Sequence, residues 1–173
     1  MQTPIAREYP DFITVTCLDW IPVIMEDRFK EIIIESLKFL THDNRIAVYG
    51  FVIMPNHLHM IWQILGEHKR EDVQRDFLKF TSQQILKHLR NEHAMLQKRL
   101  VVDAKDRKHQ VWKRNSLSIP LWSDRVFTQK LDYIHNNPVK ARLCIYPEDY
   151  HYSSARFYQL NDNHWGFLTH YNG

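Results

Sequence analysis

The sequence predicts an α+β fold in which an antiparallel sheet has helices packed on one face. Its 173 residues are 44% hydrophobic and 25% charged, which is typical of a globular domain and excludes a disordered chain. Segments with strand-like alternation and segments with helical periodicity follow the order strand–helix–strand–strand–helix–strand. This is the order of a ferredoxin-like split βαβ unit. Only two cysteines are present, so a disulfide-stabilised scaffold and a cysteine-based zinc cluster are excluded.

The first four elements are predicted from short-range patterns. Residues 11–18 alternate and are rich in β-branched side chains, as expected of a strand. Residues 26–41 begin with two acidic side chains and then place apolar residues three or four positions apart, which is typical of an amphipathic helix. Residues 45–54 and 57–65 are two mostly apolar strands, and a Pro-Asn pair separates them.

The second half of the chain has a weaker pattern. Residues 71–91 have the periodicity of a second helix, and we expect a strand near residues 109–114. Residues 126–136 form a third, short helix. Pro138 is expected to end that helix, because the residue before a proline avoids the helical region.

These elements form one domain over residues 1–173, with a core at about residues 10–140 and an aromatic tail at 141–173. The beginning of the chain has no apolar signal region, and no run of 18 apolar residues occurs. We therefore expect a soluble cytoplasmic protein without a membrane partner.

Positive charge is concentrated in the middle of the chain. The net charge is +3, but residues 66–125 hold 14 Lys and Arg against 8 Asp and Glu. Such a segment is commonly a solvated helix face, and with interleaved aromatic residues it also suits a surface that binds unstacked nucleic-acid bases. Composition favours neither interpretation. The candidate DNA-binding residues are Lys79, Lys108, Trp112, Lys113 and Arg114.

Two histidines on the third predicted strand are candidate metal ligands. His57 and His59 are two residues apart, so alternation directs both imidazoles to the same face of the sheet. Two imidazoles on one face can converge on a metal ion. With 11 histidines in the chain, a His-x-His pattern is also expected by chance, and two surface histidines would look the same.

A second candidate group lies on the last predicted helix. Tyr133 and Asn137 are four residues apart and therefore share a helix face. The pair fits a tyrosine nucleophile beside an amide metal ligand, and it fits equally a packing tyrosine near a helix cap. Because the ordinary pKa of a tyrosine is about 10, a nucleophilic role would need help from a metal or a polarised leaving group.

Four segments of the chain resemble the REP-associated tyrosine transposases. Residues 51–59 read FVIMPNHLH and residues 133–140 read YIHNNPVK, similar to the two signatures of that family. Residues 76–82 (DFLKFTS) and 150–156 (YHYSSAR) add further similarity. These bacterial proteins are relatives of single-strand DNA transposases that have a His-hydrophobic-His motif and one catalytic tyrosine. Before the tyrosine helix the family often has Trp-Gln and then a Gly-aromatic pair, whereas residues 111–116 read VWKRNS.

The resemblance implies an HUH endonuclease fold and a metal-dependent transposase or nickase that cleaves and rejoins single-stranded DNA. Tyr133 would be the catalytic nucleophile, forming a 5′-phosphotyrosine intermediate. His57, His59 and Asn137 would hold Mg²⁺ or Mn²⁺. The implied partner is single-stranded or hairpin DNA from palindromic repeats, and the implied location is the nucleoid. Related small transposases are dimers and some members of the family are monomers, so the resemblance leaves a homodimer open.

Two other functions are compatible with the residues alone. A non-catalytic module could bind hairpin DNA or RNA with the same fold and the same basic surface. A metal-dependent hydrolase could use His57 and His59 with an acidic ligand, leaving Tyr133 structural. Formation of a covalent protein–DNA adduct distinguishes the transposase from both.

Overall fold

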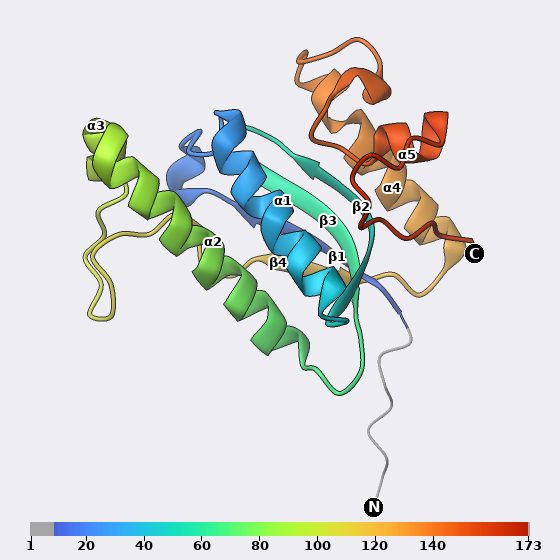
Figure 1. Cartoon of the computed structure of the whole chain (residues 1–173), viewed down its shortest axis with the longest axis horizontal. Coiled ribbons are helices and arrows are strands. Elements are labelled where there is room, and N and C mark those ends of the chain that lie inside the picture. The colour runs from blue at the N-terminus through green and yellow to red at the C-terminus, as the bar shows by residue number, and fades with distance from the viewer. Residues whose placement is uncertain (1–8, 173) are drawn as a thin grey trace, which may run out of the picture.

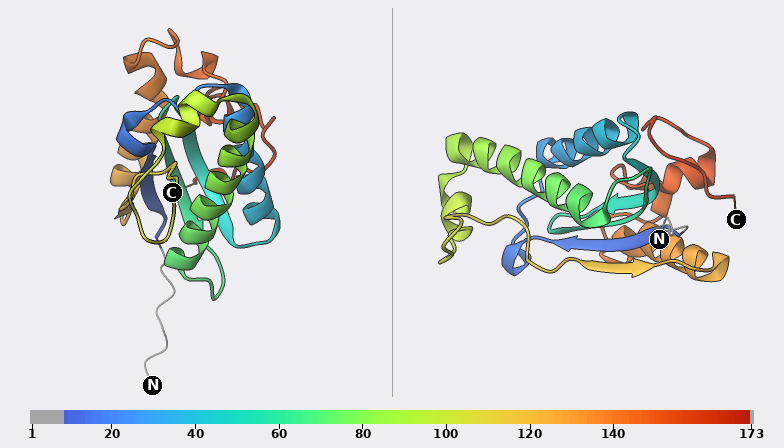
Figure 2. Two further views of the ribbon diagram at one scale, coloured as in Figure 1. Left: turned by 90° about the vertical axis from the view of Figure 1, so that its left-hand side faces the viewer. Right: turned by 90° about the horizontal axis from the view of Figure 1, so that it is seen from below.

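The computed structural model describes residues 9–172 and contains a four-stranded sheet with helices on both of its faces (Figures 1 and 2). No helix within this range is both long enough and apolar enough to cross a membrane. The strands are β1 (Asp11–Thr16), β2 (Ile46–Ile53), β3 (His57–Ile64) and β4 (Leu117–Pro120). The helices are α1 (Asp27–His42), α2 (Arg70–Glu92), α3 (Ala94–Arg99), α4 (Asp124–Lys140) and α5 (Ala155–Leu160).

The sheet has the strand order β2-β3-β1-β4, and each neighbouring pair is antiparallel. This arrangement confirms the α+β class and the element order predicted from sequence. The register pairs His57 with Thr16 and His59 with Thr14. The two histidines therefore lie beside the central strand β1, near the end of the sheet where the β2–β3 turn meets the segment after β1.

Helices α1 and α2 cover one face of the sheet, as the sequence analysis expected (Figure 2, right). Ile13, Val15 and Trp62 are fully buried on this side, together with apolar residues of both helices. Burial of a large apolar side chain contributes about 1.5–3 kcal/mol. This face is therefore the main core of the domain and has no room for a polar site.

Helix α4 packs on the opposite face, which the prediction of helices on a single face did not include (Figure 2, right). A second, smaller core joins the helix to the sheet and contains Phe12, Ile61, Phe127 and Ile134. The side chain of Ser123 caps the helix by accepting a hydrogen bond from the Val126 amide at 3.3 Å. Consequently α4 begins at Asp124, two residues before the predicted start.

The same helix also continues beyond Pro138, which was expected to end it. A proline removes one N–H donor and crowds the turn before it, yet the helix continues through Pro138 to Lys140. The Ala141 amide still donates to the Asn137 carbonyl at 3.0 Å and closes the helix after Lys140. Asn137 is therefore a helical residue rather than a cap.

The strand predicted near residues 109–114 is wrong in position. The fourth strand is β4 at Leu117–Pro120, while residues 109 and 112 make only isolated bridges, to Val101 and Cys17. A short stretch of extended chain can pair through single bridges without forming a strand, and its pattern in the sequence looks the same.

The aromatic tail closes the outer edge of β2 and contains the short helix α5. Single bridges join Val52 to Ser153 and Val48 to Leu168. The Thr169 amide donates to the Val48 carbonyl at 2.8 Å, and the Ile53 amide donates to the Tyr152 carbonyl at 2.9 Å. Covering the edge in this way prevents β2 from pairing with another chain.

A buried polar contact anchors α4 to the sheet. His135 is 4% exposed, and its Nε2 lies 2.8 Å from the hydroxyl of Ser154. That hydroxyl also accepts a hydrogen bond from the Phe51 amide at 2.9 Å. Gly50 allows the close approach, because a Cβ at this position would lie 2.6 Å from the Leu131 side chain. The contact therefore joins α4, β2 and the tail.

We expect His135 to make stability depend on pH. Burial lowers its pKa to about 4, whereas an unfolded histidine has a pKa of about 6.5. Between these values the unfolded chain binds a proton that the folded chain excludes. Stability linked to His135 is thus complete above about pH 6.5 and is lost as the pH falls towards 4, by about 3 kcal/mol at most.

The variant His135→Gln tests this prediction, since glutamine keeps a polar group near Ser154 but does not titrate. Urea unfolding of both proteins between about pH 7 and pH 4.5 gives the free energy of unfolding at each pH. The wild type should lose more stability on acidification than the variant. His57 and His59 are present in both proteins, so their contributions cancel, and equal slopes would contradict the assignment.

Candidate functional site

The two histidines of β3 face the side of the sheet that α4 covers. Their ring centroids are 4.8 Å apart, and the rings are inclined by 71°. Leu58 and Met60 alternate with them and point into the main core. The sequence therefore predicted correctly that both imidazoles share one face.

Each imidazole has one nitrogen fixed by a neighbouring side chain. Nδ1 of His57 lies 2.7 Å from Oδ1 of Asn56, and Nδ1 of His59 lies 2.8 Å from the hydroxyl of Thr14. Nδ2 of Asn56 donates to the backbone carbonyl of Trp20, so Oδ1 is the atom that faces His57. The Nδ1 of His57 therefore carries a proton, and its Nε2 keeps a free lone pair.

Burial keeps both histidines neutral. It lowers the pKa of His57, and it lowers the pKa of His59 to about 3, with further contributions from the neighbouring His57 and from the positive charge of Lys130. A neutral imidazole with a fixed Nδ1 and a free Nε2 is the form that binds metal ions. The chemistry of this pair therefore fits a metal ligand.

Helix α4 brings the two remaining predicted site residues to the histidines. The Tyr133 ring lies 5.1 Å from the His59 ring, and Asn137 is close enough to His57 to act on its pKa. Tyr133 is 39% exposed, so part of this residue is open to solvent. All four residues predicted from the two sequence signatures thus come together, although they lie on two separate elements.

A metal ion at this place would need Asn137 as its third protein ligand. Within residues 9–172, no cluster of three or more His, Cys, Asp or Glu side chains could hold a metal ion. Two imidazole nitrogens and one amide oxygen make a neutral donor set of three. Such a set leaves positions free for phosphate oxygens and water.

The sequence analysis missed several residues that surround Tyr133. The ammonium group of Lys130 lies 5.6 Å from the centre of the tyrosine ring, and that of Lys140 lies 5.7 Å from it. Phe12 packs edge-on against Tyr133 at 6.1 Å and stacks on His59 at 5.5 Å. The lysines are three residues before and seven after Tyr133, so helical spacing could have identified them.

One of the expected DNA-binding residues, Lys113, lies near the site because its backbone pairs with the end of β1. Its amide donates to the Thr16 carbonyl at 2.7 Å, and Thr16 pairs with His57 across β1 and β3. Trp112 forms a bridge with Cys17, and the neighbouring Lys113 is exposed at this end of β1.

Trp112 itself is buried, which corrects its assignment as a DNA-contacting residue. It is 6% exposed, and its indole N–H donates to the hydroxyl of Thr81 on α2 at 3.0 Å. No face of this ring is open to a base. The basic neighbours in the sequence suggested an exposed position, but Trp112 packs in the main core together with Val111.

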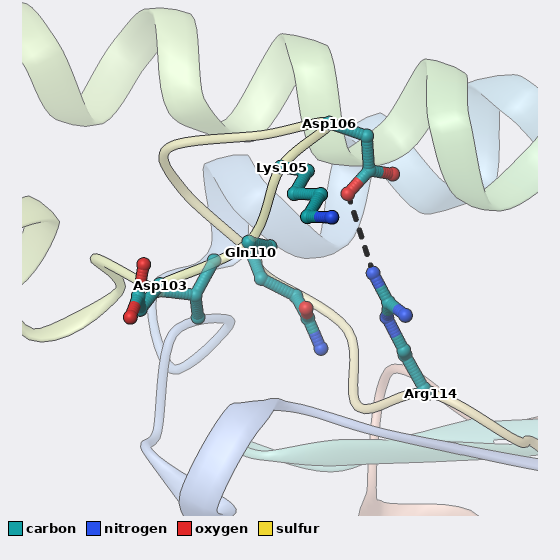
Figure 3. A pocket seen from close by; sticks show the side chains of 7 residues that line it. Asp103, Lys105, Asp106, Gln110 and Arg114 are labelled. Carbon is teal, nitrogen blue, oxygen red and sulfur yellow. Dashed lines mark hydrogen bonds and ion pairs between the residues drawn. The ribbon is translucent and has the colours of Figure 1, made fainter.

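The remaining expected DNA contacts are exposed residues of α2 and of the segment around Trp112. Lys79 is exposed on α2, which covers the other face of the sheet, and Lys108 is exposed on the loop before Trp112. Arg114 forms an ion pair with Asp106 at 3.4 Å, across an open pocket of about 460 Å³ (Figure 3). Acidic and basic side chains alternate around this pocket, so it is not a uniformly positive surface. Residues that line this pocket include Asp103, Lys105, Asp106, Gln110 and Arg114 (Figure 3).

Comparison with known proteins gives a match in structure but not in sequence. No protein-family model matches the chain, and no curated protein matches it. A solved REP-associated tyrosine transposase bound to a REP hairpin superimposes with a TM-score of 0.66. The superposition covers 100% of this chain and 90% of the other, at 15% sequence identity. A candidate transposase from Deinococcus radiodurans matches with a TM-score of 0.47 and 14% identity, over 79% of this chain and 97% of the other.

The resemblance found in the short signatures and the similarity of the whole backbone therefore agree, although they rest on different observations. The chain has the fold of a REP-associated tyrosine transposase.

Proposed function

We propose that this protein is a transposase-type enzyme that cleaves and rejoins single-stranded DNA through Tyr133. The observation that carries the proposal is the contact between the partly exposed Tyr133 and His59, whose rings are 5.1 Å apart, with the second neutral histidine, His57, beside His59. The fold shared with a REP-associated tyrosine transposase supports it. That solved protein carries a REP hairpin, and we propose hairpin-forming DNA with a single-stranded flank as the substrate here.

His57, His59 and Asn137 would hold a divalent cation, for which we propose Mg²⁺ or Mn²⁺. Such an ion would polarise the phosphate to be cleaved and stabilise the negative charge that develops on it. The protein's own contribution is to keep both imidazoles neutral and in a fixed orientation, through Asn56, Thr14 and burial.

The reaction of Tyr133 is an exchange of one phosphoester bond for another. The tyrosine oxygen forms a bond to phosphorus while the bond between phosphorus and the 3′ oxygen breaks. The phenolic proton passes to solvent, and the departing 3′ oxygen takes up a proton. The products are a 5′-phosphotyrosine and a free 3′-hydroxyl, and because a phosphoester bond is retained, rejoining needs no ATP.

Lys130 and Lys140 would bind the DNA backbone on either side of Tyr133. Both ammonium groups lie within 6 Å of the tyrosine ring, so a phosphate that reaches the hydroxyl would also be close to both charges. Lysine is a common partner of phosphate. Lys113, whose amide bonds to Thr16 at the end of β1, would add a third positive charge.

The variant Tyr133→Phe should abolish a denaturant-stable protein–DNA adduct while DNA binding stays nearly unchanged, because only the attacking oxygen is lost. The substrate is a hairpin oligonucleotide with a single-stranded flank, labelled either at its 5′ end or at its 3′ end. In the wild type, the 3′ label should remain on the protein in denaturing gels, and the 5′ label should be released with a free 3′-hydroxyl.

The matched control is Tyr146→Phe, since Tyr146 is an exposed tyrosine (60%) outside the histidine site. It should form the adduct at the wild-type level. An adduct that persists in Tyr133→Phe would eliminate Tyr133 as the nucleophile. Release of a free 5′-phosphate without any adduct would instead indicate a hydrolase, and binding without reaction would indicate a non-catalytic module.

Removal of the proposed ligands should weaken metal binding in an order set by their chemistry. His57→Ala and His59→Ala should each remove metal-dependent cleavage, and excess Mn²⁺ should rescue the single variants partly but the double variant not at all. Asn137→Ala should weaken Mn²⁺ binding less, because a neutral amide oxygen is a weaker ligand than imidazole.

Titration calorimetry with Mn²⁺ measures these affinities directly. His151→Ala is a suitable control, since His151 is exposed and belongs to the tail. Thermal unfolding of each variant separates lost metal binding from lost structure, which matters for the buried His59. Unchanged Mn²⁺ affinity in the double histidine variant would refute the metal site.

The salt dependence of DNA affinity should locate the binding surface. If Lys113, Lys130 and Lys140 each contact a phosphate, replacing all three with alanine should flatten the slope of log affinity against log salt by about 2 units, at about 0.7 per phosphate. Affinity should fall alike for every sequence. A control triple variant removes three exposed charges of α2: Lys79, Lys87 and Arg90.

The control tests the earlier expectation for Lys79. Its slope should equal that of the wild type, because α2 lies on the far face of the sheet from Tyr133. If the α2 variant flattens the slope and the other variant does not, the DNA follows α2 and the proposed surface is wrong.

A further inference from the structure

An exposed tryptophan stands next to the histidine site, on an element that no proposed step uses. Trp20 is 57% exposed and ends the short 3-10 turn η1 (Leu18–Trp20), which follows β1. Its ring centroid is 5.8 Å from that of His57, and the two rings are inclined by 70°. In this edge-to-face arrangement His57 covers at most one face of the indole. A large flat apolar surface is therefore open beside a proposed ligand.

The backbone that presents this ring is in an unfavourable conformation. Asp19 has φ +49° and Trp20 has φ +57°, which is the left-handed region that residues other than glycine seldom adopt. A strained conformation of this kind persists only where the surrounding structure enforces it, and it is found most often at functional sites. The position therefore carries a bulky aromatic side chain where glycine would fit more easily.

Asn56 connects this turn to the site. Its side-chain amide donates to the Trp20 carbonyl at 3.2 Å, and its side-chain oxygen is 2.7 Å from Nδ1 of His57. Its backbone carbonyl accepts a hydrogen bond from the Cys17 amide at 2.8 Å. One residue thus fixes both the orientation of His57 and the backbone of Trp20, so the turn that presents the indole is held in place relative to the site.

We propose that Trp20 is a stacking platform for a nucleobase of the single-stranded DNA next to the cleaved phosphate. The proposal rests on the proposed function and adds a residue that positions the substrate. The rings of Trp20, His57, His59 and Tyr133 follow one another at centroid distances of 5.8, 4.8 and 5.1 Å. A strand with its phosphate at Tyr133 would bring a base within a few nucleotides to Trp20, and a single-stranded base has a free π-face for stacking.

The other tryptophans show why Trp20 is the candidate. Trp62, Trp112 and Trp165 are at most 7% exposed. Trp122 is 62% exposed, but it precedes the first turn of α4. The ring contacts of the described residues join Trp20, and not Trp122, to the histidines. Trp20 and Trp122 are therefore the two exposed tryptophans in the described residues, and one of them is at the site.

This exposure pattern allows a fluorescence test in the Tyr133→Phe background, which should bind DNA without reacting. In Trp122→Phe the exposed tryptophan that remains is Trp20, and in Trp20→Phe it is Trp122. The probe is a hairpin oligonucleotide with a single-stranded flank. We expect the DNA to quench the emission of the Trp122→Phe protein and to leave the emission of the Trp20→Phe protein nearly unchanged.

A second measurement identifies the base that stacks on Trp20. Abasic sites are introduced one at a time along the flank, and affinity is measured with each oligonucleotide. One position should lower the affinity of the otherwise unchanged protein, on the order of tenfold, as loss of one base–aromatic stack does. Trp20→Ala should lose affinity for the intact oligonucleotide by a similar factor and should no longer respond to that abasic site, whereas Trp20→Phe should keep most of the effect.

The melting temperature of a Trp20 variant distinguishes a role in DNA binding from a role in stabilising the fold. Trp20→Gly should have a melting temperature at or above that of the wild type, because glycine adopts the positive φ without strain, yet it should bind DNA as weakly as Trp20→Ala. A lower melting temperature together with unchanged affinity would show that Trp20 only packs against His57, and would overturn the proposal.

Equal quenching in the two phenylalanine variants, or an abasic effect that survives in Trp20→Ala, would also overturn it. The proposed reaction fails separately, since it is measured by the adduct at Tyr133 rather than by quenching. A protein that forms the adduct but shows no Trp20-dependent quenching has the proposed function without the base platform. A protein that shows the quenching without an adduct has the platform without the reaction.

Discussion

The contact between His135, Ser154 and Phe51 is the constraint on which the site depends. Tyr133 and Asn137 lie on one side of α4, and His135, between them in sequence, points to the other side and into the protein. The buried imidazole meets the Ser154 hydroxyl at 2.8 Å, and that hydroxyl binds the backbone of β2. A buried polar group without a partner costs about 1–3 kcal/mol, so α4 has one favoured rotation on the sheet. That rotation places Tyr133 beside His59.

The charge around the site is suited to an anionic substrate. The two imidazoles are neutral because they are buried, and the nearby positive charge of Lys130 disfavours protonation of His59 further. The third candidate ligand is an amide rather than a carboxylate. None of these three donors would offset the charge of a bound cation, and Lys130 and Lys140 add to it. The site therefore combines candidate metal ligands with positive charge, and positive charge favours the binding of a phosphate backbone.

The sequence predicts much of this arrangement because its strongest signals are local. Alternation on β3 determines that His57 and His59 share a face, and the four-residue spacing on α4 does the same for Tyr133 and Asn137. What local patterns cannot show is a contact between distant segments. Ser154 lies 19 residues from His135, and nothing in the spacing indicates that the tail turns back to meet α4. The prediction that Trp112 contacts DNA was wrong for a related reason, since its hydrogen-bond partner Thr81 belongs to the distant helix α2.

The central strand β1 explains why elements so far apart in sequence can form one site. On the face that carries the histidines, Phe12 stacks on His59 and meets the edge of Tyr133, and Thr14 fixes Nδ1 of His59. Thr16 pairs with His57, and its backbone carbonyl accepts a hydrogen bond from the Lys113 amide. Each of these alternate residues thus holds a different part of the site, while Ile13 and Val15 between them are buried in the main core. Because Ile13 and Val15 fix β1 in the main core, the residues on its other face are held rigidly as well. The segments that would contact the DNA pack around this strand.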